Sequence, residues 1–156
     1  MHTDSVHGHT DPATALARAE ALCRERGARF TPLRRRVFEL VVEAGQPLTA
    51  YELLARFAED GGNPAPPTVY RALEFLQAHG LVHRLASQNR WVVCDHPSDP
   101  HGGLFLVCRT CGRAVEWADE GVAQALHTSA RAAGFQLPVE VLPEVEGLCG
   151  DCVDAH

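Results

Sequence analysis

The stretch from His83 to Glu116 concentrates the side chains of this sequence that could do chemistry. Its 34 residues contain three histidines, three cysteines and several carboxylates. Thiolates and imidazoles together are donors that zinc and related transition metals prefer in proteins. The stretch therefore predicts metal binding, and a later cysteine pair, Cys149 and Cys152, extends that prediction to the end of the chain.

Four of the six cysteines form two Cys-x-x-Cys pairs, Cys108 with Cys111 and Cys149 with Cys152, with 37 residues between the pairs. Each pair can place two thiolates on one zinc ion at about 2.3 Å. Four thiolates leave no open coordination position, so the pattern predicts a closed, structural zinc site. The alternative is a pair of redox dithiols, but neither pair begins a helix in a thioredoxin-like context.

A second candidate ligand set mixes donor types and consists of His83, Cys94, His101 and Glu116, with His96 as a competing ligand. One thiolate, two imidazoles and one carboxylate suit Zn(II), whereas an iron sensor more naturally uses only nitrogen and oxygen ligands. Each residue taken alone is better explained as a surface or core residue. Their positions around a linker, described below, favour one site that would fix two parts of the chain against each other.

Length and composition set the class of protein. A chain of 156 residues can form one domain or two small ones, and its 46% hydrophobic and 22% charged content is ordinary for a soluble globular protein. No run resembles a signal peptide or a membrane span, which predicts a cytoplasmic protein without a membrane partner. In that compartment, six cysteines are expected to be reduced thiols or metal ligands.

Four helices are expected between residues 11 and 80, after a disordered tail over residues 1–10. Each of the first three has a polar cap and the fourth begins at a proline: the start signals are Asp11-Pro12, Thr31-Pro32, Thr49 with Glu52, and Pro67-Thr68. In the fourth helix an apolar face at helical spacing points inward, formed by Val69, Ala72, Leu73 and Leu76. The lone Cys23 lies on the apolar stripe of the first helix and is interpreted as core.

Two short β-like runs follow, over residues 81–85 and 91–94, around a polar turn at residues 87–89. Helices followed by such a hairpin predict a winged helix-turn-helix domain over residues 11–94; the alternative is a plain helical bundle with an appended hairpin. Thr68, Tyr70 and Arg71 face outward in the first turn of the fourth helix, where side chains can reach base edges and phosphates in the major groove. Double-stranded DNA is therefore the expected partner.

The net charge of −6 is unevenly distributed. Residues 1–84 have 10 arginines against 10 acidic residues, and residues 85–156 have 4 against 10. The window 18–36 holds seven arginines against Glu20 and Glu25, a local charge of +5. A basic first half is compatible with DNA binding, and Arg34, Arg35 and Arg36 are expected to attract phosphates; the alternative is a solvated helix face.

Residues 95–103 read as a hinge, and residues 104–156 as a small α/β domain that completes an α+β chain. Strands are expected over 104–107 and 114–117, a helix over 119–134 with Val122, Leu126 and Ala130 on one face, and a strand over 139–145. Pro143 in that last run removes a ladder donor and indicates an edge or a bulge. The open edge of such a sheet would be closed by a second copy of the chain, so a homodimer is expected.

These residues resemble the ferric uptake regulator family, and within it the zinc uptake regulator branch. The matching segments cover nearly the whole chain after the tail: RFTPLR (29–34), PPTVYRAL (66–73), GLVH (80–83), WVVC (91–94), LVCRTCG (106–112) and GLCGDC (147–152). The resemblance implies a homodimeric repressor whose zinc-loaded form binds operators of zinc-uptake genes. It implies two Zn(II) per chain, structural zinc on Cys108, Cys111, Cys149 and Cys152, sensing zinc on His83, Cys94, His101 and Glu116, and DNA contacts by Tyr70 and Arg71.

The residues disfavour two rival functions. A sister sensor for iron, manganese or peroxide is disfavoured by the Cys94 thiolate and, for iron, by the lack of a histidine cluster before Cys108, where only His101 stands. An enzyme is disfavoured because the His-x-Glu pattern of zinc deaminases and the His-Glu-x-x-His pattern of zinc proteases do not occur.

Overall fold

The computed structural model describes residues 11–95, 103–138 and 142–155. Its contacts divide the chain into two compact units, Met1–Ser98 and Asp99–His156. The tail expected over residues 1–10, most of the hinge expected over 95–103, and the candidate ligands His96 and His101 lie outside the described residues. None of the described helices is long and apolar enough to cross a membrane.

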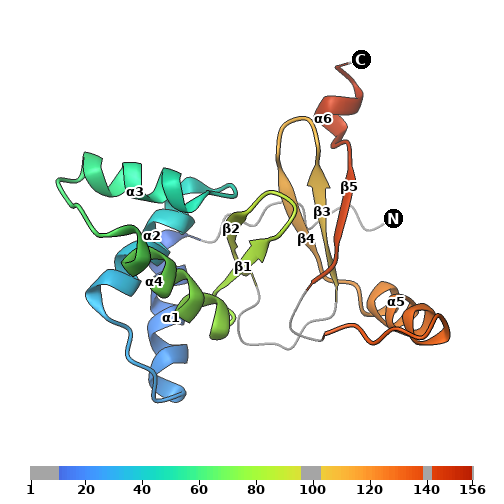
Figure 1. Ribbon diagram of the computed structural model, residues 1–156, viewed down its shortest axis with the longest axis horizontal. Coiled ribbons are helices and arrows are strands. Elements are labelled where there is room, and N and C mark those ends of the chain that lie inside the picture. Colours follow the sequence, from blue (N-terminus) through green and yellow to red (C-terminus); the bar gives the residue numbers. More distant parts are fainter. Residues whose placement is uncertain (1–10, 96–102, 139–141, 156) are drawn as a thin grey trace. The chain divides into compact units, whose positions relative to one another are not determined.

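The first unit begins with four helices, α1 (Pro12–Glu25), α2 (Pro32–Ala44), α3 (Ala50–Glu59) and α4 (Pro66–Ala78) (Figure 1). The predicted caps are confirmed: the Asp11 and Thr31 side chains accept the N–H groups of Thr14 and Arg34, and Thr49 and Glu52 form a reciprocal capping box. Helix α4 starts one residue earlier than expected, at Pro66, because two consecutive prolines occupy positions where no N–H is needed.

A two-stranded antiparallel hairpin, β1 (Val82–Leu85) and β2 (Arg90–Val93), follows α4 and forms the wing. The turn between the strands is closed by Asn89 at a φ of 50°, a conformation that asparagine tolerates better than most residues. Strand β2 also pairs with the α2–α3 connection, because the Leu48 and Trp91 backbones exchange two hydrogen bonds of 2.9 and 2.7 Å. The helices and the wing thus form a single winged helix-turn-helix unit.

The core of this unit forms where the helical spacing predicted it. Val69, Leu73 and Leu76 of α4 are fully buried, and Ala72 is 3% exposed. Cys23 is 1% exposed and packs in the same cluster, so its interpretation as a core residue is confirmed. Because the inward face of α4 is buried in this core, the opposite face, with Tyr70 and Arg71, is exposed.

The second unit contains a three-stranded sheet in the order β4-β3-β5 and two helices. Strand β3 (Leu104–Cys108) pairs antiparallel with β4 (Ala114–Trp117) and parallel with β5 (Glu144–Gly147). Helix α5 spans Glu120–Ala132 and α6 spans Gly150–Val153. Figure 1 shows α6 directly after β5, at the end of the sheet that also carries the β3–β4 turn, and α5 beyond the opposite end.

Of the strand expected over 139–145, residues 139–141 lie outside the described residues, and in the described part the strand is β5, Glu144–Gly147. Strand β5 begins at Glu144, directly after Pro143, and lies at an edge of the sheet. Pro143 has no N–H to offer a ladder, but its carbonyl accepts a hydrogen bond of 2.8 Å from the Phe105 N–H. The proline therefore sets the start of the strand instead of interrupting it.

The apolar face expected on α5 is largely uncovered within the described residues. Ala123 is buried, whereas Val122 is 39% exposed and Leu126 and Ala130 are half-buried. Leu106 and Val145, which are register partners on β3 and β5, are 42% and 47% exposed. Within the described residues, the predicted apolar face of α5 therefore stays largely exposed.

Candidate metal centres and nucleic-acid interface

The four paired cysteines lie on two turns at one end of the second unit's sheet. Cys108 ends β3 and Cys111 lies in the turn to β4, where Gly112 at a φ of 76° lets the backbone reverse. Cys149 is the N-cap of α6 and Cys152 lies within it. Because β3 and β5 run parallel, with Cys108 in register with Gly147, both turns emerge on the same side.

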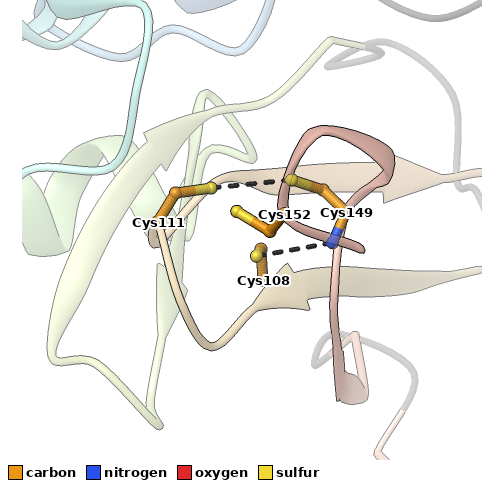
Figure 2. A group of neighbouring side chains, drawn as sticks. All are labelled: Cys108, Cys111, Cys149 and Cys152. Carbon is orange, nitrogen blue, oxygen red and sulfur yellow. Dashed lines mark hydrogen bonds between the residues drawn. The ribbon is translucent and has the colours of Figure 1, made fainter. Parts of the chain in front are cut away.

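The four sulfur atoms converge on one point (Figure 2), and all lie within 4.8 Å of one another. The Sγ atoms of Cys111 and Cys149 are 3.7 Å apart, and the Cys149 N–H donates to Cys108 Sγ at 3.4 Å. A tetrahedral ion with bonds of about 2.3 Å has ligand-to-ligand edges of about 3.8 Å. The spacing fits that tetrahedron, whereas a disulfide requires about 2 Å; the four thiols are free.

The thiols of this cluster resist ionising together. The backbone N–H groups of Cys111 and Cys149 lower the pKa of Cys108 to about 6. A hydrogen bond with Cys149, followed by burial, raises the pKa of Cys152 to about 12. Once the first thiolate forms, its negative charge opposes the next. A bound divalent cation would remove that opposition, so the donor set fits zinc.

The mixed ligand set is partly assembled in the first unit. The ligand atoms of His83 on β1 and Cys94, directly after β2, lie within 4.8 Å of each other. Cys94 is 4% exposed, and its N–H donates to the Leu81 carbonyl at 3.0 Å. Glu116 lies on β4 of the second unit, half-buried. Of the three candidate histidines, His83 is within the described residues, and it shares the first unit with Cys94.

The predicted reading face of α4 has the expected exposure. Thr68 in the first turn is half-buried, and Tyr70 and Arg71 in the second turn are exposed, Tyr70 by 42%. Pro66 and Pro67 at the start of the helix have no N–H, and the N–H groups of Thr68 and Val69 donate to the Ala65 carbonyl. This end of α4 can therefore present side chains to a ligand, namely a cation, a phenol and a hydroxyl, rather than backbone donors.

The three arginines of α2 are engaged within the chain. The Arg34 guanidinium lies 3.7 Å from the centre of the Phe75 ring and donates to the Arg29 carbonyl at 2.5 Å. The neighbouring two are ion-paired: Arg35 with Glu20 and Glu39, and Arg36 with Glu39, Glu43 and Asp60. The local charge that the sequence assigned to this helix is therefore largely compensated.

The sequence predicts Trp91 only as a strand residue, but in the structure its ring packs on helix α4. Its ring is 4% exposed and packs edge-to-face on Tyr70, with centroids 5.9 Å apart and planes at 74°. Its position could have been inferred from strand alternation, because an aromatic residue on the inward face of a wing strand has to pack on a helix.

The fold and the site define a winged-helix protein with an appended four-cysteine metal centre. The sequence model of the ferric uptake regulator family matches residues 25–141, and the chain belongs to that family. It is 40% identical over 144 residues to the zinc uptake regulation protein of Escherichia coli K12, covering 90% of this chain and 82% of the relative. The family consists of regulators and not of enzymes.

Two solved structures share the fold over nearly the whole chain. A zinc uptake regulator complexed with zinc and DNA has a TM-score of 0.83 and 39% identity, with 94% of this chain and 97% of that chain covered. Holo XcZur has a TM-score of 0.79 and 46% identity, with 92% and 99% covered.

Proposed function

We propose that this protein is a zinc-responsive transcriptional repressor that binds operators of zinc-uptake genes in the cytoplasm. The observation that carries the proposal is the position of His83 and Cys94, which come together on the wing of a winged-helix unit whose helix α4 exposes Tyr70 and Arg71. Metal ligands on a DNA-reading unit connect metal supply to DNA binding. The proposal is supported by the 40% identical zinc uptake regulation protein and by the relative solved with zinc and DNA.

One zinc per chain is assigned to Cys108, Cys111, Cys149 and Cys152. The spacing of the four sulfurs and their resistance to joint ionisation support this assignment. Bound zinc would cross-link the β3–β4 turn to the β5–α6 turn and stabilise the second unit. This unit buries few side chains of its own, so a metal cross-link is a large part of what can hold it together.

A second zinc per chain is assigned to His83, Cys94, His101 and Glu116, and we propose that it is the sensing ion. Cys94 and His83 are prearranged on the hairpin, while Glu116 belongs to the second unit. A metal that takes ligands from both units restrains one against the other. The domain limits proposed for this mechanism are 11–94 for the DNA-binding domain, 95–103 for the hinge and 104–156 for the dimerisation domain.

The active species is proposed to be a homodimer formed through the second unit. Leu106 and Val145 on the sheet and Val122 on α5 are apolar and exposed, and strand β5 lies at an open sheet edge. Exposed apolar faces next to an open edge are a surface that a second copy can cover. A dimer also presents two reading helices, which a two-fold symmetric operator requires.

Zinc is proposed to act by selecting the arrangement of the two reading units that fits the operator. Moving such an equilibrium from 1:99 to 99:1 takes a preference of about 10⁴-fold, or about 5.5 kcal/mol. Structural zinc sites bind with apparent free energies of about 10 kcal/mol or more, so one ion per chain is sufficient. Thr68, Tyr70 and Arg71 would make the contacts to DNA, and Arg34, which lies over the Phe75 ring, would add attraction to phosphates. Arg35 and Arg36 were expected to do the same, but they would add little because carboxylates compensate their charges.

The proposal is tested with Cys94→Ser. This variant should keep the fold and the four-cysteine zinc, fall from two zinc ions per chain to one, and lose zinc-dependent binding to a DNA duplex selected from a random pool by the zinc-loaded wild type. Cys23→Ser is the matched control, because Cys23 is a buried thiol in the same unit, outside both ligand sets. Normal zinc-dependent DNA binding by Cys94→Ser would refute the assignment.

A sister sensor of the same family is the alternative. Titrating DNA binding against buffered free zinc, iron and manganese separates the two, because a thiolate-containing site favours zinc. A response to iron or manganese at lower free metal than to zinc would support the alternative.

A further inference from the structure

We propose that Trp91 is a positioning residue that fixes the Tyr70 ring of the reading helix and links it to the zinc ligands of the wing. The inference rests on the proposed function and adds a route within the first unit from the metal ligands to the DNA-reading side chain. It starts from a contrast in exposure: Tyr70 is 42% exposed, while Trp91 beneath it is 4% exposed. Part of the Tyr70 ring is thus held by Trp91, and the rest is open to a ligand.

The contact has the geometry of a specific aromatic pair. The ring centroids are 5.9 Å apart and the planes meet at 74°, an edge-to-face arrangement. Such pairs are attractive beyond the area that they bury, because the edge of one ring faces the electron-rich face of the other. An exposed tyrosine near the start of a helix would otherwise sample several rotamers, so the pair restricts where its phenol can be presented.

Trp91 is itself immobilised by its surroundings in the first unit. Its backbone exchanges two hydrogen bonds with Leu48, and the neighbouring Arg90 side chain donates to the Pro47 carbonyl at 3.0 Å and contacts Glu52 at 3.3 Å. Glu52 in turn caps α3. Strand β2 is therefore tied to the start of α3 on one side and, through the Trp91 ring, to α4 on the other.

The indole N–H makes no hydrogen bond to any of the described residues, although it is buried. Trp91 therefore contributes the packing of its aromatic ring at this position and not a hydrogen bond from its indole N–H. Phenylalanine preserves a ring face for Tyr70 and removes the buried donor, whereas leucine preserves only the apolar character. These two substitutions separate ring geometry from simple burial.

The same hairpin carries the metal ligands. Cys94 follows three residues after Trp91, and its N–H is bonded to Leu81 across the hairpin at 3.0 Å. His83 lies in register with Val92, and Arg84 with Trp91. A metal ion that draws His83 and Cys94 together acts on both strands next to Trp91. Because β2 is short and fixed at Leu48, a shift at Cys94 is transmitted to the Trp91 ring and from there to Tyr70.

The first test measures coupling between the two rings. Tyr70→Leu, Trp91→Leu, the double variant and Trp91→Phe are loaded with zinc and titrated with the selected duplex and with duplexes changed at single base pairs. Trp91→Leu should weaken binding by about 2- to 12-fold per half-site and lose the same base discrimination as Tyr70→Leu. The double variant should lose no more than Tyr70→Leu alone, and Trp91→Phe should bind like the wild type.

Additive losses in the double variant, or intact base discrimination in Trp91→Leu, would overturn the proposal. Zinc content and thermal unfolding of each variant are measured in parallel. Failure of the wild type to bind any duplex in the presence of zinc would instead refute the proposed function, so the two failures are distinguishable.

A second measurement does not depend on Trp91→Leu folding. The chain has two tryptophans, so Trp117→Phe leaves Trp91 as the only indole fluorophore. Adding zinc to this variant without DNA should change the Trp91 emission, and adding the selected duplex to the zinc-loaded form should change it again. The second change should disappear in the Trp117→Phe/Tyr70→Leu double variant. Emission that zinc leaves unchanged would refute the link from the metal ligands to Trp91.

Discussion

Arg71 and Arg35 should contribute very differently to DNA binding, although both are exposed arginines of the first unit. Arg71 lies in the second turn of α4, and no ion pair within the described parts of the chain engages it. Arg35 and its neighbour Arg36 share four carboxylates, those of Glu20, Glu39, Glu43 and Asp60. Two cations against four anions leave that cluster at −2, which does not attract phosphates.

The size of the expected Arg71 contribution follows from the salt dependence of DNA binding. Each phosphate that a side chain neutralises contributes about 0.9 to the slope of log affinity against log salt. Removing Arg71 from both chains of a dimer should therefore lower the slope by about 1.8 if it contacts a phosphate. Between 50 and 200 mM NaCl, the advantage of the wild type over Arg71→Ala should then shrink about 12-fold.

The assay is fluorescence anisotropy of the selected duplex, titrated with zinc-loaded protein at several NaCl concentrations. Arg35→Ala is the matched control, because it removes the same formal charge from the same unit, and its slope should stay close to that of the wild type. A loss of affinity in Arg71→Ala that is constant with salt and confined to one base pair would indicate a base contact instead. A slope change in Arg35→Ala as large as in Arg71→Ala would refute the reasoning.

The structure supports four further predictions. Cys111→Ser should remove one zinc per chain by elemental analysis and unfold the second unit at lower temperature, whereas Cys23→Ser should keep all zinc. Arg34→Ala should lower the free energy of unfolding by about 1 kcal/mol through the lost stacking on Phe75, with unchanged urea m-value. Thr49→Ala should cost about 1 kcal/mol by removing the α3 cap; an equal loss in Ala50→Gly would show that helix propensity alone is measured. Burial, followed by the charges of Arg26 and Arg34, lowers the pKa of His79 below its usual 6.5. The unfolded chain therefore binds a proton at this histidine before the folded chain does, and the free energy of unfolding should fall as the pH drops below 6.5. His79→Gln should flatten this part of the plot of unfolding free energy against pH, and an unchanged plot would exclude His79 as the cause.

The local elements of the first unit follow from the sequence because their determinants are local. Thr49 and Glu52 are three residues apart, and Pro32 directly follows the capping Thr31. Each helix start is therefore determined by residues within a few positions of one another. The inward face of α4 follows from its apolar spacing in the same way. The four-cysteine centre is equally accessible, because two Cys-x-x-Cys turns allow few arrangements other than one shared metal.

The features that could not be predicted from the sequence are contacts between positions far apart in the chain. The compensation of Arg36 by Asp60 joins residues on α2 and after α3, and no spacing rule indicates it. The stacking of Arg34 on Phe75 and of Tyr70 on Trp91 has the same character. The run of arginines on α2 therefore suggests a free basic patch in the sequence. In the fold, carboxylates compensate the charges of Arg35 and Arg36. In the described part of the strand expected over 139–145, the strand starts only after Pro143, because the carbonyl of this proline can accept a hydrogen bond although the residue has no N–H to donate.

The two proposed zinc sites differ in whether their ligands belong to one unit or to two, and that difference suits their roles. All four thiols of the first site belong to one compact unit and already lie within 4.8 Å of one another, so metal binding there orders little additional chain. Of the ligands proposed for the second site, His83 and Cys94 belong to the first unit and Glu116 belongs to the second. An ion that bound all of them would spend part of its binding free energy on restraining the units, which would weaken its affinity relative to the first site. The sensing ion should therefore be the first to leave as free zinc falls, while the second unit remains folded and able to dimerise.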